Sequence, residues 1–425
     1  MLVELESNVR SYCRSFPDIF DKAEGVFVFS VKGQRYVDFL SGCGSLNYGH
    51  NHPRLREALL SYIGNKGITT SLDVKTRSKN EFMEVFAEHI LRSRKLDYKF
   101  QFPGPTGTNA VEAAIKLARK FTGRSGIIAF TNAFHGCSLG ALALTGSQHH
   151  RNNSEALLTN VMRAPYDGYL GVDVDTSVYL EKLIVDPSSG YNLPAAIIVE
   201  TIQGEGGLNV ASVEWMQNIT RLAQKHNILL IVDDIQAGCG RSGNFFSFES
   251  SGIYPDIVCL AKSVSGFGLP MSLVLIKPEL DIWEPGEHNG TFRGNNLAFV
   301  TASKAIDLFW SNDTFQREVK ERISKTRTFL EDLSRSYPKH VFVKGQGMIM
   351  GLEFSDSQLP KTIQKECFLK GLIIELCGPN DEVLKLLPPL NIDVDILQEG
   401  LEIIGEVTRN VLESENSILS KVIHG

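Results

Sequence analysis

Short apolar runs alternate with amphipathic segments through the middle of the chain. The runs are rich in β-branched residues and are bounded by polar or glycine-rich segments, which is typical of strands buried on both faces. Intervening segments such as residues 213–226 carry apolar positions at helical spacing. The alternation predicts an α/β domain with a mainly parallel sheet. The predicted strands span residues 127–130, 195–200, 228–233, 256–261 and 273–276.

The pattern changes after about residue 310. A charged helical segment at residues 315–337 is followed by strand-like pieces at 341–343 and 347–354, and by a final helix from about Asp395. We expect a second, smaller α+β domain that the N-terminal segment joins. The predicted organisation has an N-terminal part of the small domain at residues 1–60, a large domain at 61–310 and a C-terminal part of the small domain at 311–425.

Composition narrows the function. The 425 residues are 43% hydrophobic and 22% charged, as in soluble globular proteins, and the net charge of -6 argues against nucleic acid or an anionic membrane as main partner. No apolar run could span a bilayer, and the N-terminal stretch MLVELESNVRSYCRSF has no signal-peptide core. Seven cysteines without a CxxC pair suggest neither a disulfide framework nor a zinc site. We expect a cytoplasmic protein that binds small molecules and no metal.

Two charged side chains stand at the ends of apolar strands. Asp233 closes the run ILLIVD, and Lys262 follows DIVCLA. Asp233 either pairs with a cationic ring nitrogen of a cofactor or caps the next turn, since a buried carboxylate needs a partner. Lys262 is either a surface cation or an amine held for Schiff-base chemistry. Because parallel strands end at one edge of a sheet, we expect both groups at the same rim.

A third element is the turn TGTN at residues 106–109, which precedes a helix with an apolar face that includes Phe121. Asn109 and Glu112 resemble a capping pair. A small turn that contains glycine and ends in a helix N-terminus offers free backbone N–H groups to a phosphate. The alternative is an ordinary capped helix.

Two further loops follow predicted strands. One carries Phe134 and His135, and the other Glu200 and Glu205. Phe134 could stack on a flat cofactor, although a single aromatic residue is more often part of the core. The five elements together supply an amine, a carboxylate, a phosphate-binding turn and a flat surface. These are the groups that pyridoxal 5'-phosphate requires, so their coincidence predicts a site for this cofactor.

A different function is suggested by Gly238, Gly240 and Gly243, which have the GxGxxG spacing of a dinucleotide site. That fingerprint directly follows its strand and opens a helix, whereas here DDIQA intervenes and the glycines lead into a loop-like segment. A nicotinamide-linked oxidoreductase is therefore a remote alternative. A non-enzymatic scaffold is disfavoured because every position that the chemistry needs is filled.

The sequence resembles the class III (ω-type) aminotransferases along nearly its whole length. The blocks DDIQAGCGRSG and LAKSVSGFGLP are similar to the aspartate and lysine blocks of the family. The resemblance implies the fold-type I architecture of pyridoxal-phosphate-dependent transferases, with a mainly parallel seven-stranded sheet in the large domain. It also implies a homodimer, or a dimer of dimers, with shared active sites.

Within this family, the chain is most similar to the branch that makes L-2,4-diaminobutyrate. The segments that carry this likeness are SYCRSFP, LNYGHNHP, FPGPTGTNAVEAAIKLARK, PYDGY and WEPGEHNGTFRGNN. We therefore expect transfer of an amino group from L-glutamate to the aldehyde L-aspartate 4-semialdehyde. Ornithine, acetylornithine and 4-aminobutyrate are alternative substrates. The product serves compatible-solute (ectoine), siderophore and peptide-antibiotic synthesis alike, and the sequence leaves the pathway open.

The resemblance assigns a role to each candidate residue. Lys262 and Asp233 are the catalytic pair: Lys262 binds the cofactor as a Schiff base and moves a proton, and Asp233 holds the pyridinium charge. The residues that would bind the substrate are Glu200, Glu205 and Lys385. The other cofactor-binding residues are Gly107 and Thr108 at the phosphate, Phe134 and His135 at the ring, Gln236 near the ring hydroxyl, and Thr291, which reaches the phosphate of the neighbouring subunit.

One position departs from the family pattern. Many ω-aminotransferases have an arginine before a Pro-Pro pair, where it pairs with a glutamate and can switch to the substrate carboxylate. This chain has VLKLLPPL, so Lys385 stands opposite Glu205. A lysine offers a point charge and lacks the bidentate fork of arginine.

Overall fold

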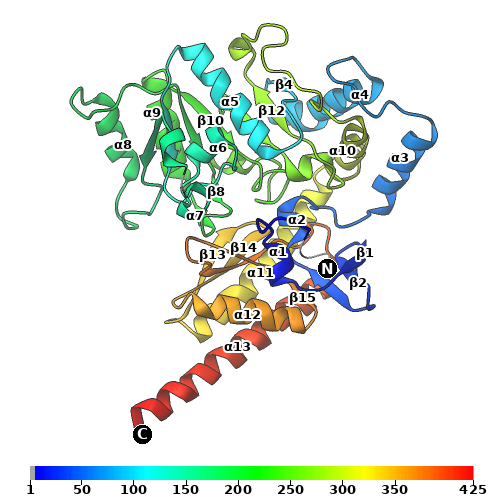
Figure 1. Cartoon of the computed structure of the whole chain (residues 1–425), viewed down its shortest axis with the longest axis vertical. Helices are drawn as coiled ribbons and strands as arrows, with labels where there is room; N and C mark the ends of the chain where they lie inside the picture. Colours follow the sequence, from blue (N-terminus) through cyan, green and yellow to red (C-terminus); the bar gives the residue numbers. More distant parts are fainter. Residues whose placement is uncertain (1–4, 153, 425) are drawn as a thin grey trace.

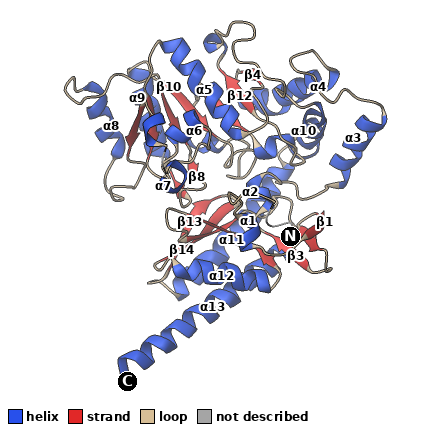
Figure 2. Ribbon diagram, in the orientation of Figure 1, coloured by secondary structure: helices blue, strands red, loops and turns tan. Residues whose placement is uncertain are grey.

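A seven-stranded sheet organises the larger part of the molecule in the computed structural model, which describes residues 5–152 and 154–424. Its strand order is β4-β12-β11-β10-β7-β5-β6, and β12 runs antiparallel to both neighbours while the other pairs are parallel. The predicted mainly parallel α/β sheet is confirmed (Figures 1 and 2). The strands are β4 (Lys99–Gln101), β5 (Ile127–Phe130), β6 (Val161–Ala164), β7 (Ala196–Val199), β10 (Leu229–Asp233), β11 (Ile257–Leu260) and β12 (Leu273–Ile276).

The five strands predicted from apolar runs all form, and every residue of β5, β7, β10, β11 and β12 is buried. The two strands without such a run, β4 and β6, lie at the edges of the sheet. Their sequences, KFQ and VMRA, each combine buried positions with more exposed ones. A short mixed sequence of this kind has no distinctive pattern, because only one of its faces needs to be apolar.

Helices cover both faces of this sheet (Figure 2). The predicted crossover helix at 213–226 forms as α9 (Val213–Lys225), which Ser212 caps by accepting a hydrogen bond from the Trp215 N–H. One expectation for the helix after residue 106 is wrong: Phe121 is 41% exposed and is therefore not part of the buried apolar face of this helix. The other helices of this part are α3 (Pro53–Gly64), α4 (Arg77–Phe86), α5 (Gly107–Thr122), α6 (Leu139–Leu144), α7 (Gln148–Arg151), α8 (Thr176–Val185) and α10 (Asn296–Phe309).

The smaller part contains two four-stranded sheets, of order β1-β2-β3-β15 and β13-β14-β17-β16. Because β15 pairs in parallel with β3, the N-terminal and C-terminal segments share one sheet. The N-terminal strands were not predicted. The strands are β1 (Phe20–Glu24), β2 (Phe27–Ser30), β3 (Arg35–Asp38), β13 (Val341–Gln346), β14 (Ile349–Phe354), β15 (Leu372–Ile373), β16 (Glu375–Cys377) and β17 (Val383–Leu386).

Three helices accompany these sheets, α11 (Thr314–Ser336), α12 (Gln358–Leu369) and α13 (Val394–His424), and α13 extends away from the body of the molecule (Figure 1). The short helices α1 (Tyr12–Ser15) and α2 (Ser41–Gly44) lie where the two parts meet, as does the hairpin of β8 (Ile202–Gln203) and β9 (Asn209–Val210). We propose to divide the chain at residues 60 and 310, with residues 1–60 and 311–425 forming the small domain.

Membrane-spanning features are absent from the described residues: none of their helices combines the length and apolarity that a bilayer crossing needs. Residues 1–4 of the stretch in which we expect no signal peptide lie outside the described part.

Candidate active site

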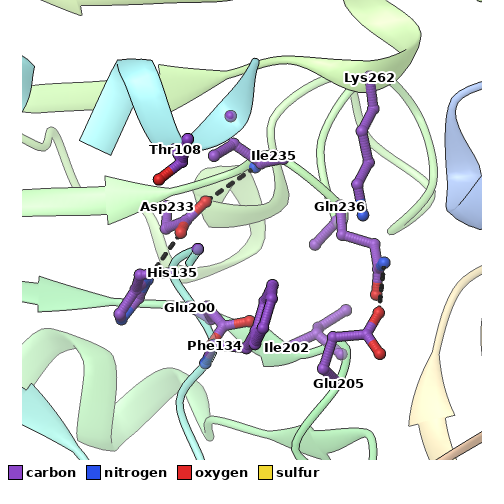
Figure 3. A pocket seen from close by; sticks show the side chains of 13 residues that line it. Thr108, Phe134, His135, Glu200, Ile202, Glu205, Asp233, Ile235, Gln236 and Lys262 are labelled. Carbon is purple, nitrogen blue, oxygen red and sulfur yellow. Dashed lines mark hydrogen bonds and ion pairs between the residues drawn. The ribbon is translucent and has the colours of Figure 1, made fainter. Parts of the chain in front are cut away.

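A cavity of about 180 Å³ opens at the carboxyl ends of β5, β7, β10 and β11 (Figure 3). This is the edge where a parallel sheet gathers its binding loops. Nine residues predicted for the site line it: Gly107, Thr108, Phe134, His135, Glu200, Glu205, Asp233, Gln236 and Lys262. The remaining lining residues are Gly136, Ile202, Ile235 and Ala237.

Asp233 is the last residue of β10 and is only 5% exposed. Its Oδ2 lies 2.7 Å from Nδ1 of His135, and its Oδ1 accepts a hydrogen bond of 3.2 Å from the Ile235 N–H. The His135 ring is itself fully buried. Two partners on different loops therefore fix the orientation of the Asp233 carboxylate (Figure 3).

Lys262 follows β11 after one residue and points into the cavity (Figure 3). Strands β10 and β11 run in parallel with Asp233 in register with Cys259, so the two charged residues emerge at the same rim. The backbone of Lys262 has a φ of 52°, in the left-handed region that a long side chain rarely adopts. Such strain persists where the surroundings enforce it, often at functional sites.

The first turn of α5 brings Gly107 and Thr108 to the cavity, as its position after a strand suggests. A Cβ at Gly107 would lie 3.0 Å from the Ile235 side chain, so glycine keeps this corner open. The Thr108 hydroxyl lies 2.7 Å from that of Ser138. Because this helix is long and its first N–H groups have no partners within the helix, they suit an anionic group.

The predicted capping pair is wrong in its details. Asn109 sits inside the helix, and its Oδ1 accepts hydrogen bonds from the N–H and hydroxyl of Thr106, which is the N-cap residue. Glu112 instead accepts from the backbone N–H groups of Gly140 and Ala141, at 2.9 and 3.1 Å. Sequence spacing could not reveal this, because the partners of Glu112 are supplied by the first turn of another helix, α6.

Glu200 follows β7 and lies beside Asp233. Its Oε2 accepts a hydrogen bond of 3.0 Å from the Phe134 N–H, which holds the Phe134 ring at the cavity wall (Figure 3). Burial, together with the nearby charge of Asp233, raises the pKa of Glu200 well above its usual value. Glu200 and Asp233 thus place two carboxyl groups side by side in the lining of the cavity.

Glu205 occupies the opposite wall, in the loop between β8 and β9. Its Oε1 accepts from Gln236 Nε2 at 3.0 Å and lies 2.9 Å from Nζ of Lys385, which is fully buried on β17. Burial alone would raise the pKa of Glu205, but the charges of Lys385 and Lys262 lower it to about 2. Glu205 thus presents a charged carboxylate to the cavity.

Sequence reasoning missed Glu375, Tyr12 and Cys43. Glu375 Oε2 lies 3.0 Å from Nζ of Lys385, and Glu375 Oε1 accepts a hydrogen bond of 2.6 Å from the Tyr12 hydroxyl. The Tyr12 hydroxyl also lies 2.8 Å from Sγ of Cys43. One signal was available: Glu375 is the lone charge in the apolar run LIIELC, where a carboxylate requires a buried partner.

Two predicted site residues, Lys385 and Thr291, do not line the cavity. Lys385 contacts it through Glu205, whereas Thr291 has no such link to the lining among the described residues. Thr291 is exposed, on the loop before α10. Its predicted contact is with a second subunit, so its role stays a prediction.

The cavity residues fit pyridoxal 5'-phosphate. The Lys262 amine has no hydrogen-bond partner among the described residues and is free to attach an aldehyde. Gln236 Oε1 is buried beside the cavity and likewise has no partner in the described part of the chain. Asp233 supplies the carboxylate for a ring nitrogen, and α5 supplies N–H groups for a phosphate.

The glycine block at residues 238–243 does not form a dinucleotide site. It continues into turns and a short 3-10 helix and opens no α-helix. Its backbone N–H groups are used internally: that of Gly238 donates to the Asp234 carbonyl, that of Gly240 to the Phe245 carbonyl, and that of Gly243 to the Gly240 carbonyl. These groups are therefore not available to a pyrophosphate.

Comparison with known proteins agrees with this geometry. The model of the family described as aminotransferase class-III matches residues 11–408. A diaminobutyrate--2-oxoglutarate transaminase of Vibrio parahaemolyticus is 54% identical over 400 residues, 94% of each chain. One from Halalkalibacterium halodurans is 50% identical over 98% of this chain and 97% of its own length.

Among solved structures, an ornithine aminotransferase of Toxoplasma gondii superposes with a TM-score of 0.83 at 26% identity. The match covers 97% of this chain and 94% of the other, which has PLP at partial occupancy in its active site. An aminotransferase of Bacillus anthracis gives a TM-score of 0.84 at 23% identity, over 96% of both chains, and supports the fold.

Proposed function

We infer that this chain, which belongs to the class III aminotransferases, transfers the amino group of L-glutamate to L-aspartate 4-semialdehyde, with L-2,4-diaminobutyrate and 2-oxoglutarate as products. The family depends on pyridoxal 5'-phosphate. The substrates follow from relatives of that activity that are 50–54% identical over nearly the whole chain. The reaction is reversible and proceeds in two half-reactions at one site.

The observation that carries the proposal is the placement of Lys262 and Asp233. Their strands are neighbours in the sheet, and both side chains face one cavity (Figure 3). A cofactor ring that reaches both groups has its aldehyde at the amine and its nitrogen at the carboxylate. No other amine lines this cavity among the described residues.

Each side chain then has a definite task. When bound, pyridoxal 5'-phosphate supplies an electron sink for a negative charge on the substrate carbon. The Lys262 amine holds the cofactor and carries the proton between the two carbon atoms that exchange it. The Asp233 carboxylate, oriented by His135, keeps a proton on the ring nitrogen. Gly107 and Thr108 bind the phosphate, Phe134 packs on the ring, and Gln236 contacts its hydroxyl side.

The substrate side of the site comprises Glu200, Glu205 and Lys385. Glutamate and 2-oxoglutarate carry a carboxylate on the reacting carbon, whereas diaminobutyrate and its aldehyde do not. The same wall must therefore accept an anionic and a neutral group in turn. Glu205, which faces the cavity, has to move or lose its partner when the anionic substrate enters.

We also propose that the active enzyme is a cytoplasmic homodimer, or a dimer of dimers. Thr291 is exposed and does not line the cavity of its own chain, so it is available to the phosphate site of a second subunit. Mixing a Lys262→Ala chain with a Thr291→Ala chain tests this. Hybrid dimers should recover one intact site, and no recovery would contradict a shared site.

A defined amino donor and acceptor screen tests the reaction. Purified protein with added cofactor is supplied with L-glutamate and L-aspartate 4-semialdehyde, and the products are identified by mass spectrometry. L-2,4-diaminobutyrate should form with equimolar 2-oxoglutarate. A clear preference for the semialdehyde of ornithine, acetylornithine or 4-aminobutyrate would replace the proposed substrate, and reduction of NAD without amino transfer would overturn the reaction class.

A further inference from the structure

Lys385 is shared by two carboxylates, and this sharing leaves the cavity wall with a net negative charge. Its Nζ lies 2.9 Å from Glu205 Oε1 and 3.0 Å from Glu375 Oε2, and it also donates to the Gly204 carbonyl at 3.2 Å. We call Glu205, Lys385 and Glu375 the Lys385 cluster. One positive and two negative charges give the cluster a net charge of -1.

The cluster is built into the fold. Glu375 and Lys385 are direct cross-strand partners on β16 and β17, so their side chains share one face of the sheet. The Lys385 side chain is fully buried and that of Glu375 is 6% exposed, whereas Glu205 is 31% exposed and faces the cavity. A solvent counterion therefore cannot reach Lys385. The Glu205 carboxylate presents the excess negative charge of the cluster to the cavity.

Each carboxylate of the cluster also has a hydrogen-bond donor besides Lys385: Gln236 donates to Glu205, and Tyr12 donates to Glu375. Burial alone would lower the pKa of Lys385, but the two carboxylates raise it well above its usual value. The Tyr12 hydroxyl donates to Glu375 Oε1 at 2.6 Å and stabilises its charge. A pair of Glu205 and Lys385 alone would be neutral; Glu375 is the residue that makes the wall negative.

We propose that Glu375 is a specificity-determining residue, which keeps the Lys385 cluster negative so that Glu205 binds the ammonium group at the non-reacting end of a diamine substrate. The proposal rests on the function proposed above. In L-2,4-diaminobutyrate and L-aspartate 4-semialdehyde, the 2-ammonium group stays in place while carbon 4 reacts near Lys262. Glu205 and Lys262 face the same cavity close enough for the Lys262 charge to act on the Glu205 carboxyl (Figure 3).

The same charge acts against a dicarboxylate. When Glu205 moves aside for the α-carboxylate of glutamate, Lys385 remains paired with Glu375, and the exposed site is neutral instead of cationic. Glu375 therefore weakens binding of the dicarboxylate while it strengthens binding of the diamine. A residue with only a structural role would affect both substrates in the same direction.

The first test compares L-2,4-diaminobutyrate with 4-aminobutyrate, which differs only by lacking the 2-ammonium group. With 2-oxoglutarate as acceptor, the ratio of their kcat/KM values measures recognition of that group. Glu375→Gln, which keeps an oxygen for Tyr12 but removes the charge, should reduce the ratio about tenfold, or about 1.4 kcal/mol. Glu375→Asp, which keeps the charge, should retain most of the wild-type ratio.

The second test needs no turnover. Calorimetry measures the Kd of glutarate, a dicarboxylate without an amine, for the cofactor-loaded enzyme. Glu375→Gln should bind glutarate about fivefold more tightly than the wild type. The control is Glu353→Gln, which removes a carboxylate that pairs with Lys344 at 3.8 Å outside the cavity, and it should change neither measurement.

The outcomes separate the two proposals. If the wild type does not use L-2,4-diaminobutyrate, the proposed function fails. If it does, but Glu375→Gln leaves both the ratio and the glutarate Kd unchanged, or Glu375→Asp loses as much as Glu375→Gln, then charge at Glu375 does not set specificity. Should Glu375→Gln not fold, Glu375→Met gives the same neutral cluster and must lose the same discrimination.

Discussion

The two ends of the cavity are built in different ways. At the strand end, Asp233 ends β10, and His135 and Lys262 lie in the segments that follow β5 and β11, so all three positions follow from the order of parallel strands in one sheet. At the other end, the Lys385 cluster joins the β8–β9 loop to two strands of a separate antiparallel sheet. The first end thus depends on a single element of structure, and the second on how two parts of the molecule pack.

Their electrostatics differ as well. Asp233 has one buried histidine as partner, and its neighbour is Glu200, whose pKa is raised well above its usual value by burial. In the Lys385 cluster, two carboxylates share one ammonium group, and each lies within 3.0 Å of its nitrogen. At the strand end, each task in the reaction therefore depends on a single residue. In the Lys385 cluster, removal of one member changes the charge of the whole cavity wall. Four substitutions test this contrast.

Lys262→Ala should have the largest effect. No other amine lines the cavity among the described residues, so transamination should fall by more than about 10⁴-fold. The visible absorbance that arises from covalent attachment of the cofactor should also disappear. Lys99→Ala, which removes a half-exposed lysine paired with Asp281, is the control. An unchanged spectrum would show that another residue binds the cofactor.

Asp233→Ala should reduce kcat by about 10²- to 10³-fold, because it removes the carboxylate that stabilises charge on the ring nitrogen. Single-turnover kinetics on the cofactor-loaded variant separates this loss from loss of cofactor. Asp281→Ala removes an exposed carboxylate and should retain full rates. Wild-type rates for Asp233→Ala would mean that Asp233 only caps its turn.

Lys385→Met should act on stability as much as on activity. It leaves two buried or half-buried carboxylates without their cation, and we expect a loss of about 3–5 kcal/mol. Lys370→Met removes an exposed lysine at 2.9 Å from Glu406 and should cost less than about 1 kcal/mol. Urea unfolding compares the two. Equal losses of unfolding free energy would show that Lys385 contributes no more to stability than an exposed lysine does.

Asp234→Asn should have the smallest effect, and one that depends on pH. Asp234 is fully buried, and burial raises its pKa to about 7. Since the folded pKa lies above the unfolded value, the contribution of Asp234 to stability is present below about pH 4 and is lost as pH rises through 7.

The asparagine variant has no such titration. Relative to the wild type it should gain stability between pH 5 and 7, by at most about 1.4 kcal/mol for each pH unit. Thermal unfolding at a series of pH values measures the difference. A difference that is constant with pH would show that Asp234 is ionised throughout this range in the folded protein.

Much of the strand end was predictable from the sequence. Fully apolar runs such as LLIV and IVCL predict buried parallel strands, and a parallel sheet places whatever follows them at one edge. The order of the strands alone therefore predicts that Asp233 and Lys262 lie at the same edge, and no contact between side chains has to be known. The edge strands and the N-terminal strands have no such runs and were not predicted.

The sequence by itself determined the sheet, its binding edge and the residue types that pyridoxal 5'-phosphate needs, because these depend on local periodicity and on the order of strands. Tertiary structure alone decided which distant charges share a partner. Glu375 meets Lys385 through an antiparallel pairing, and Glu205 reaches them from another hairpin. Glu112 likewise turns from its own helix to the first turn of α6. Such contacts depend on how separately folded segments pack, which no periodicity within one segment encodes.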